Sequence, residues 1–221
     1  MPGLKSEAEL RRMGFDVVLI DHHFYKDVDR RASRSSLEQL MELVRWPASA
    51  TDTAIAINDR SYIPGLKQSG LTEKLILQIR AYDRKAQGEW PDEIERMQKQ
   101  AKEVIPKLEK HGNVYVMTDK EKAVDGSYVK EALAIQSPDG LSSMLELFVH
   151  KIGFSGKPAI AKKLIALDFT TLGYERGAYN QYGGGDPGLS MFFGFKPKKP
   201  PAGEKELIPQ RVMDEILKLL E

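Results

Sequence analysis

The pattern of apolar and polar positions predicts an α/β protein with two regions of sheet. Residues 15–20 are mostly apolar and predict a buried strand, and residues 53–57 predict a second, shorter one. A strand that is apolar at successive positions is covered on both of its faces, which favours a parallel sheet. Segments whose apolar residues have helical spacing precede and follow these strands in the sequence. The predicted helices cover residues 6–13, 35–44 and most of 71–110, and capping-box sequences begin the first two, at Ser6 and Ser35.

After Gly112 the periodicity changes, and we place a domain boundary near this residue. Strands are predicted over residues 113–118, 128–136, 158–172 and 190–195, with a helix over 141–153 and an amphipathic helix over 207–220. We therefore expect three parts. Residues 1–90 form an α/β domain, residues 91–112 form a connecting helix, and residues 113–221 form a smaller α/β domain with a C-terminal helix.

The composition excludes cysteine chemistry and does not favour nucleic acid or a membrane as the partner. There are no cysteines, which excludes disulfides, thiolate metal sites and cysteine nucleophiles, so a metal site needs oxygen and imidazole ligands. The formal net charge of +1 gives no general attraction to nucleic acid, so any anion binding must be local. No segment approaches the length of a membrane span, and the first residues carry no apolar signal core. We expect a cytoplasmic protein that does not associate with membranes.

Both predicted strands of the first domain end on residues that can bind ligands. Asp21, His22 and His23 follow the first strand directly, and Asp59 and Arg60 follow the second. In open parallel sheets ligands gather at the carboxyl ends of the strands, so these side chains are candidates for one site. The alternative is a polar strand end with solvated histidines.

A glycine-rich stretch in the second domain is the other candidate for chemistry. Gly183, Gly184 and Gly185 are followed by Asp186-Pro187 and an apolar strand. Consecutive glycines in a turn can present successive backbone N–H groups to phosphate or carboxylate oxygens. The alternative is that the glycines serve only an ordinary turn.

Taken in order, these motifs resemble the DHH phosphoesterase family with its attached DHHA1-type domain. The resemblance runs from about residue 15 to residue 196 and includes Asp21-His22-His23, Asp59, the three glycines and Gly194-Phe195. It implies an α/β fold in which a parallel-sheet DHH-type domain, shortened at its N-terminus, is joined by a helix to a smaller DHHA1-like domain. It also implies a Mn²⁺-dependent phosphodiesterase or exonuclease that acts on short single-stranded nucleic acids or nucleotides, with Mg²⁺ as an alternative ion.

The resemblance assigns a role to each candidate residue. His22 is implied as a metal ligand, Asp21 as a ligand or as the partner that fixes its imidazole tautomer, and Asp59 as a further ligand. His22 and His23 are the implied catalytic residues, with His23 facing the substrate. The substrate-binding residues are His23, Arg60 and the three glycines at 183–185. Hard oxygen ligands together with imidazole suit manganese, and a metal pair can activate a bridging water.

Two differences from the family pattern point to an incomplete or weakly active enzyme. The family begins with an Asp-x-Asp strand, whereas the only Asp-x-Asp here is Asp27-Val28-Asp29, which follows the Asp-His-His motif. Asp186 stands where the family has histidine, which exchanges a donor to phosphate for an acid. A second chain supplying the missing ligands is one solution. The alternative function is an inactive relative that binds nucleic acid or a protein partner.

Basic and aromatic residues offer a local surface for such a ligand. The cations are Arg30, Arg31, Arg34 and the lysines of residues 196–199. Tyr179 and Tyr182 lie between them in the sequence and are candidates for stacking on bases. The alternative is ordinary solvated surface.

Overall fold

The computed structural model describes residues 4–21, 24–25, 28–29, 34–121 and 123–220. The chain divides into two compact units, residues 1–56 and 57–221, and helix α3 crosses the division. The assignment of residues 1–90, 91–112 and 113–221 to functional domains stays a prediction.

The first unit contains short elements. These are α1 (Leu4–Arg12), β1 (Phe24–Tyr25), β2 (Val28–Asp29), α2 (Ser36–Leu43) and the start of α3 (Ala50–Gln68). The capping box predicted at Ser35 is confirmed, because its hydroxyl accepts from the Glu38 N–H and the Glu38 carboxylate accepts from the Ser35 N–H. The cap predicted at Ser6 is wrong, since α1 already begins at Leu4.

The buried parallel strand predicted over residues 15–20 is wrong. This segment has no regular secondary structure, and Phe15 and Val18 are each 57% exposed. The described residues of the first unit contain only one two-stranded pairing, the antiparallel β1–β2. A run of apolar residues does not form a strand where no neighbouring strand is present to pair with it. The DHH-type parallel sheet is therefore not confirmed.

The strand predicted over residues 53–57 is also wrong, because this segment is part of helix α3. Helix α3 is interrupted at Tyr62, whose backbone has φ 53° and ψ −151°. Pro64 follows in the first turn after the interruption, where its missing N–H and fixed φ are tolerated.

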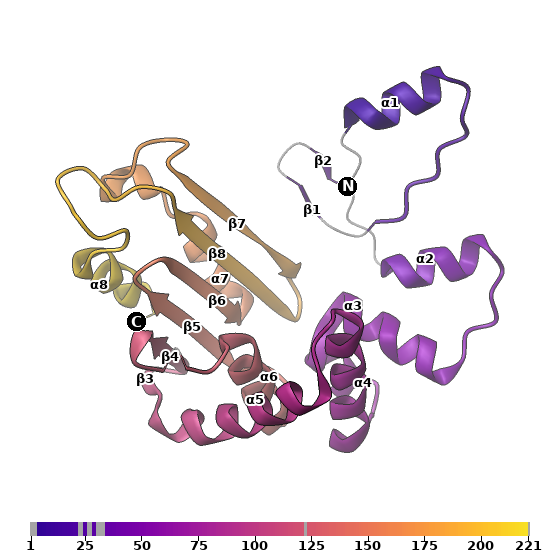
Figure 1. The fold of residues 1–221 in the computed structure, drawn as a ribbon, viewed down its shortest axis with the longest axis horizontal. Helices are drawn as coiled ribbons and strands as arrows, with labels where there is room; N and C mark the ends of the chain where they lie inside the picture. Colours follow the sequence, from indigo (N-terminus) through magenta and orange to yellow (C-terminus); the bar gives the residue numbers. More distant parts are fainter. Residues whose placement is uncertain (1–3, 22–23, 26–27, 30–33, 122, 221) are drawn as a thin grey trace. The chain divides into compact units, whose positions relative to one another are not determined.

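The second unit is built on a mixed six-stranded sheet (Figure 1). Its strands are β3 (Glu109–His111), β4 (Val114–Thr118), β5 (Ser143–Phe148), β6 (Lys151–Gly156), β7 (Tyr179–Asp186) and β8 (Ser190–Pro197). Their order is β3-β4-β5-β6-β8-β7, and only the β4–β5 pair is parallel. The α/β class is confirmed.

Helices join and cover these strands. They are α4 (Glu73–Ala86), α5 (Pro91–Val104), α6 (Gly126–Gln136), α7 (Pro158–Ile165) and α8 (Gln210–Lys218), with 3₁₀ turns η1 (Ile105–Lys107), η2 (Asp119–Glu121) and η3 (Phe169–Leu172). Helix α6 is the crossover between the parallel strands β4 and β5.

Two hydrophobic clusters lie on opposite faces of the sheet. One cluster joins β4, β5, β6 and β8 to α7 and α8, and Phe154, Phe169 and Phe195 are at its centre. The other joins only β4 and β5 to α5 and α6, through residues such as Met117 and Met144. The first face is therefore covered along the sheet, whereas the second has its core over β4 and β5.

Several predictions for the second unit are confirmed and three are wrong. The helices within 71–110, the strands at 113–118 and 190–195, and the final helix are present. Residues 128–136 and the first half of 158–172, predicted as strands, form α6 and α7. Residues 141–153, predicted as a helix, form β5 and the first half of β6. Within the described part of the chain, no helix is both long and apolar enough to cross a membrane.

Candidate functional site

Asp21 is held in the first unit by the side chain of Gln39 from α2. The Gln39 amide donates to the Asp21 carbonyl oxygen at 2.8 Å and accepts from the Asp21 N–H at 3.4 Å. Asp21 itself is 6% exposed. Its neighbours His22 and His23 lie outside the described residues, so their predicted roles stay predictions.

Asp59 and Arg60 lie on an exposed part of helix α3 in the second unit. The expectation that they end a strand is corrected, because residues 53–57 are helical. Their predicted roles in metal and substrate binding stay predictions.

The described residues do not make up the metal centre that the resemblance implies. In the described ranges, no group of three or more His, Asp or Glu side chains comes together in a way that could hold a metal ion. Both histidines of the motif and Asp27 fall outside these ranges. No catalytic step through a metal therefore follows from the described side chains.

The three glycines lie in a strand, which corrects the turn expected at these residues, and their role in substrate binding stays a prediction. Gly183, Gly184 and Gly185 belong to β7 and pair with Phe193, Phe192 and Met191 of β8. The turn comes after them. Asp186 begins it, since its carbonyl oxygen accepts from the Leu189 N–H at 3.1 Å and its carboxylate accepts from the Gly188 N–H at 2.8 Å.

The strands β6, β8 and β7 present a second face that neither hydrophobic cluster includes. Because side chains alternate along a strand, the residues on this face follow from the pairing register. They are Lys151, Gly153 and Ser155 on β6, Phe192, Gly194 and Lys196 on β8, and Asn180, Tyr182 and Gly184 on β7. We call this set the outer sheet face.

Two aromatic side chains of the outer sheet face lie over glycines of the neighbouring strand. Tyr182 of β7 is opposite Gly194 of β8, and its ring occupies the space that a Cβ at Gly194 would fill. Phe192 of β8 is opposite Gly184, and its Cζ and Cε1 atoms are 3.2 and 3.3 Å from the corresponding Cβ position. Tyr182 is 50% exposed and Phe192 is 45% exposed. Each ring therefore packs with one side against a glycine of the neighbouring strand and remains about half exposed to solvent.

A buried carboxylate with two lysines borders the outer sheet face. Glu146 of β5 is 3% exposed, and its oxygens lie 2.9 Å from Lys130 Nζ and 3.4 Å from Lys151 Nζ. Gly126 and Gly153 leave the room for it, since a Cβ at either position would overlap the carboxylate. Two lysines facing one carboxylate leave an excess of positive charge, and exposed Lys196 adds to it on the adjacent strand.

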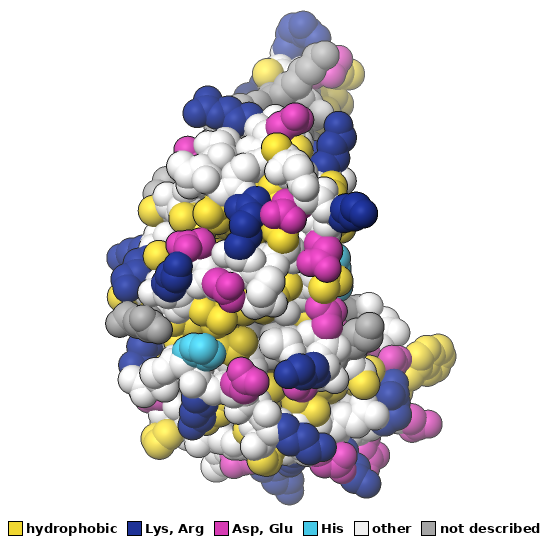
Figure 2. All heavy atoms as spheres, turned by 90° about the vertical axis from the view of Figure 1, so that its left-hand side faces the viewer, with side chains coloured by type: hydrophobic (Ala, Val, Ile, Leu, Met, Phe, Trp, Pro, Cys, Tyr) yellow, Lys and Arg dark blue, Asp and Glu magenta, His cyan; other side chains and the backbone are white. Residues whose placement is uncertain are grey.

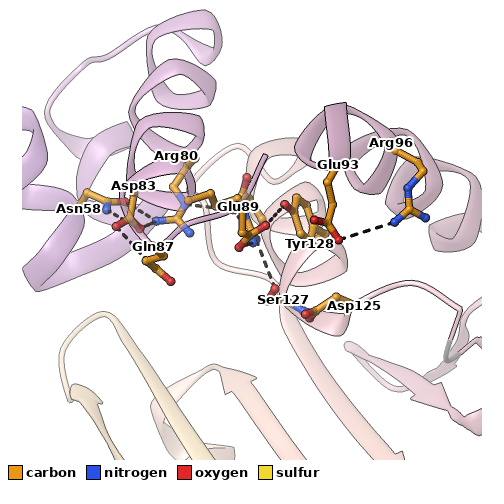
Figure 3. A network of polar contacts seen from close by, with 12 residues as sticks. Asn58, Arg80, Asp83, Gln87, Glu89, Glu93, Arg96, Asp125, Ser127 and Tyr128 are labelled. Atoms are coloured by element: carbon orange, nitrogen blue, oxygen red, sulfur yellow. Dashed lines mark hydrogen bonds and ion pairs between the residues drawn. The ribbon is translucent and has the colours of Figure 1, made fainter. Parts of the chain in front are cut away.

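A second polar network is almost completely buried and holds α4 against α6 (Figure 3). Arg80 and Arg84, one turn apart on α4, donate to Glu131 Oε2 of α6 at 3.0 and 3.1 Å. The guanidinium of Arg84 also lies 3.4 Å from the ring centroid of Tyr128. Burial raises the pKa of Tyr62, whose ring lies beneath Arg80, to about 12. The arginines bond only to Oε2 of Glu131, and its buried Oε1 has no hydrogen-bond partner among the described residues. Because these ion pairs tie α4 to α6, we assign the network to stability.

A shallow groove between α4 and α5 is a weaker candidate. Its lining includes Ala81, Tyr82 and Ile94, with Lys85 and Glu95 bringing charges of both signs. Opposite charges side by side do not select an anion or a cation. We therefore assign no ligand to this groove.

Charge elsewhere is mixed. Basic and acidic side chains are interspersed over the face of the molecule in Figure 2, in agreement with a formal net charge of +1. Arg34 is paired with Glu42, and Arg30 and Arg31 lie outside the described residues. Binding of an anion therefore depends on local lysines more than on the field of the whole protein.

Of the two tyrosines that the sequence offers as stacking candidates, only Tyr182 lies on the outer sheet face, and its role stays a prediction. Tyr179 packs against Phe169 and Phe195 in the core, with ring centroids 5.9 and 5.3 Å away, whereas Tyr182 is exposed. Phe192 and the lysine pair at Glu146 were not predicted. Alternation along the sequence SMFFGF would have separated Phe192 from the inward Phe193 and Phe195.

The chain matches no protein-family model, no curated protein and no solved structure at a significant level. The resemblance to DHH phosphoesterases therefore rests on the order of its motifs.

Proposed function

We propose that this protein is a relative of the DHH phosphoesterases that binds short single-stranded nucleic acid or nucleotides and by itself hydrolyses them poorly or not at all. The observation that carries the proposal is the outer sheet face, where Lys151 and Lys196 lie beside exposed aromatic rings on an uncovered part of the sheet. Lysines attract phosphates, and aromatic rings stack on bases of any sequence.

The phosphoesterase part of the proposal is supported by the sequence motif Asp21-His22-His23, followed in order by Asp59 and the glycine strand. A two-metal cleavage needs enough ligands to hold two cations roughly 3.5 to 4 Å apart around one activated water. By residue type, the sequence offers ligands for only one such half-site, namely His22, Asp59 and Asp21. Mn²⁺ is the implied ion, and a second chain is one way to complete the site.

The test is turnover of a short single-stranded RNA or DNA, and of a cyclic dinucleotide, with excess Mn²⁺, for the wild type and for His22→Ala. We expect weak Mn²⁺ binding and little or no turnover, together with measurable binding of the oligonucleotide. Robust turnover that disappears in His22→Ala would show that the ligand count is wrong and that Asp27 and Asp29 are candidates to complete the site. Absence of both turnover and oligonucleotide binding would overturn the proposed function.

A further inference from the structure

The structure assigns Tyr182 and Phe192 as a pair of stacking rings for two neighbouring bases of a single-stranded oligonucleotide, with Lys196 and Lys151 contacting its phosphates. This inference rests on the proposed function and names the residues that would carry it. Both rings are on the outer sheet face, on adjacent strands, and both are about half exposed.

The geometry of the two rings suits stacking on consecutive bases. Tyr182 is opposite Gly194, and Phe192 is opposite Gly184, so the two rings occupy diagonal positions across β7 and β8. Diagonal neighbours on one face are roughly 7–8 Å apart at their Cα atoms. Exposed aromatic residues on adjacent strands of a sheet are a common platform on which proteins stack two or three bases.

The glycines explain why the rings stay open. Gly184 and Gly194 have no side chain, so each ring rests on the backbone of the neighbouring strand. Small residues continue on β6, where Gly153 and Ser155 lie opposite Gly194 and Phe192. A planar ligand can therefore approach the rings from the solvent side.

The charges beside the rings favour an anionic ligand. Lys196 is two residues beyond Gly194 on the same face of β8 and is exposed. Lys151 of β6 lies next to Ile152, which pairs with Phe195, so both lysines lie at the same end of these strands. Glu146 neutralises only part of the charge of Lys130 and Lys151. Phosphates of a strand stacked on the rings would meet this excess of positive charge.

The experiment measures fluorescence anisotropy of a labelled oligothymidylate with the full chain in EDTA, which separates binding from any metal-dependent cleavage. Tyr182→Leu and Phe192→Leu keep an apolar cover on the glycines but remove the ring. We expect each to weaken binding by about 5- to 150-fold, the range measured for loss of one stacked base. Tyr182→Phe and Phe192→Tyr keep the ring and should bind like the wild type. Lys196→Gln should lower the slope of log affinity against log salt by about 0.7, as for one phosphate of a single strand.

Tyr82→Leu is the matched control, because Tyr82 is 63% exposed on α4 and is not part of the outer sheet face. It should leave the affinity unchanged. Leucine variants that bind like the wild type, or a loss of affinity confined to Tyr82→Leu, would overturn the stacking pair while leaving the proposed function intact. A wild type that binds a cyclic dinucleotide but no oligothymidylate would also overturn the stacking pair and leave the proposed function intact.

A second measurement covers the case in which the leucine variants fail to fold. Ring-proton resonances of Tyr182 and Phe192, assigned from the Tyr182→Phe and Phe192→Tyr variants, should shift when oligothymidylate is added to the wild type. Rings whose resonances stay in place while the anisotropy reports binding would also overturn the pair.

Discussion

At the scale of single residues, Glu131 of the second unit forms buried ion pairs with two arginines at once. One of its oxygens accepts from both Arg80 and Arg84, and all three side chains are less than a tenth exposed. Asn58 and Asp83 satisfy further N–H groups of Arg80, at 3.1 and 2.5 Å. A buried guanidinium without its carboxylate is costly because it has lost both water and its counter-charge.

We expect Glu131→Gln to lower the free energy of unfolding by about 3–5 kcal/mol, the cost of removing one partner of a buried ion pair. Urea unfolding at neutral pH measures this loss. Glu103→Gln makes the same chemical change on the exposed face of α5 and should alter the stability by less than about 0.5 kcal/mol. Equal effects of the two substitutions would mean that the Arg–Glu contacts contribute no stability beyond that of surface charges.

At the scale of elements, α6 links the parallel strands β4 and β5, and its start depends on Asp125. The Asp125 carboxylate accepts from the Ser127 N–H at 2.7 Å and caps the helix. Burial alone would raise the pKa of Asp125, but hydrogen bonds from Ser127 and the nearby charges of Arg84 and Lys151 outweigh it and lower the pKa. The ionised cap is therefore the stabilising form.

Asp125→Ala should lower the free energy of unfolding by about 1 kcal/mol at neutral pH, whereas Asp125→Asn should retain most of the stability. Because the folded-state pKa is lowered, the contribution of the charge is present above the ordinary value of 3.8 and is lost as the pH falls below it. The Asp125 carboxylate is exposed, so solvent screens its electrostatic contribution to stability. When unfolding is measured from neutral to acidic pH, the difference in the free energy of unfolding between wild type and Asp125→Ala should decrease. A gap that widens on acidification would contradict the sign of the shift.

The elements also show how far the sequence predicts the fold. Capped or long helical segments such as α2 and α4 were predicted correctly, because several local signals agree in them. Short apolar runs gave the errors. Residues 128–136 contain alanine, leucine and glutamate and follow the cap at Asp125, and α7 begins with Pro158 in its first turn, so both are helices despite their apolar strand-like stretches.

The candidate site was less predictable than the elements for a physical reason. The sequence predicts a helix that ends at Gly153, but Gly153 is a strand residue that leaves space for the carboxylate of Glu146. Likewise, Gly184 and Gly194 leave space for rings contributed by the partner strand. What a glycine makes room for depends on the strand beside it, and that neighbour is fixed by the order of the sheet.

At the scale of the whole molecule, the second unit contains both hydrophobic clusters. Every member of the two clusters lies between Ala81 and Leu220. We expect a fragment of residues 48–221, which retains all of α3, to fold without the preceding residues. Circular dichroism should show helix and strand, and thermal unfolding should be a single cooperative transition. A fragment that melts without cooperativity would show that residues 1–47 are required for the core.

The pairing of β6 with β8 has a consequence for how fast the molecule reaches this structure. Gly156 and Ser190, which meet where these strands pair, are 34 positions apart in the chain. The hairpins β5–β6 and β7–β8 are each closed by short connections, so they are local and form early. Joining them requires the closure of a loop that includes α7 and η3, which costs chain entropy before the shared core around Phe154 and Phe193 repays it. We therefore expect the docking of one hairpin onto the other to limit the rate of folding.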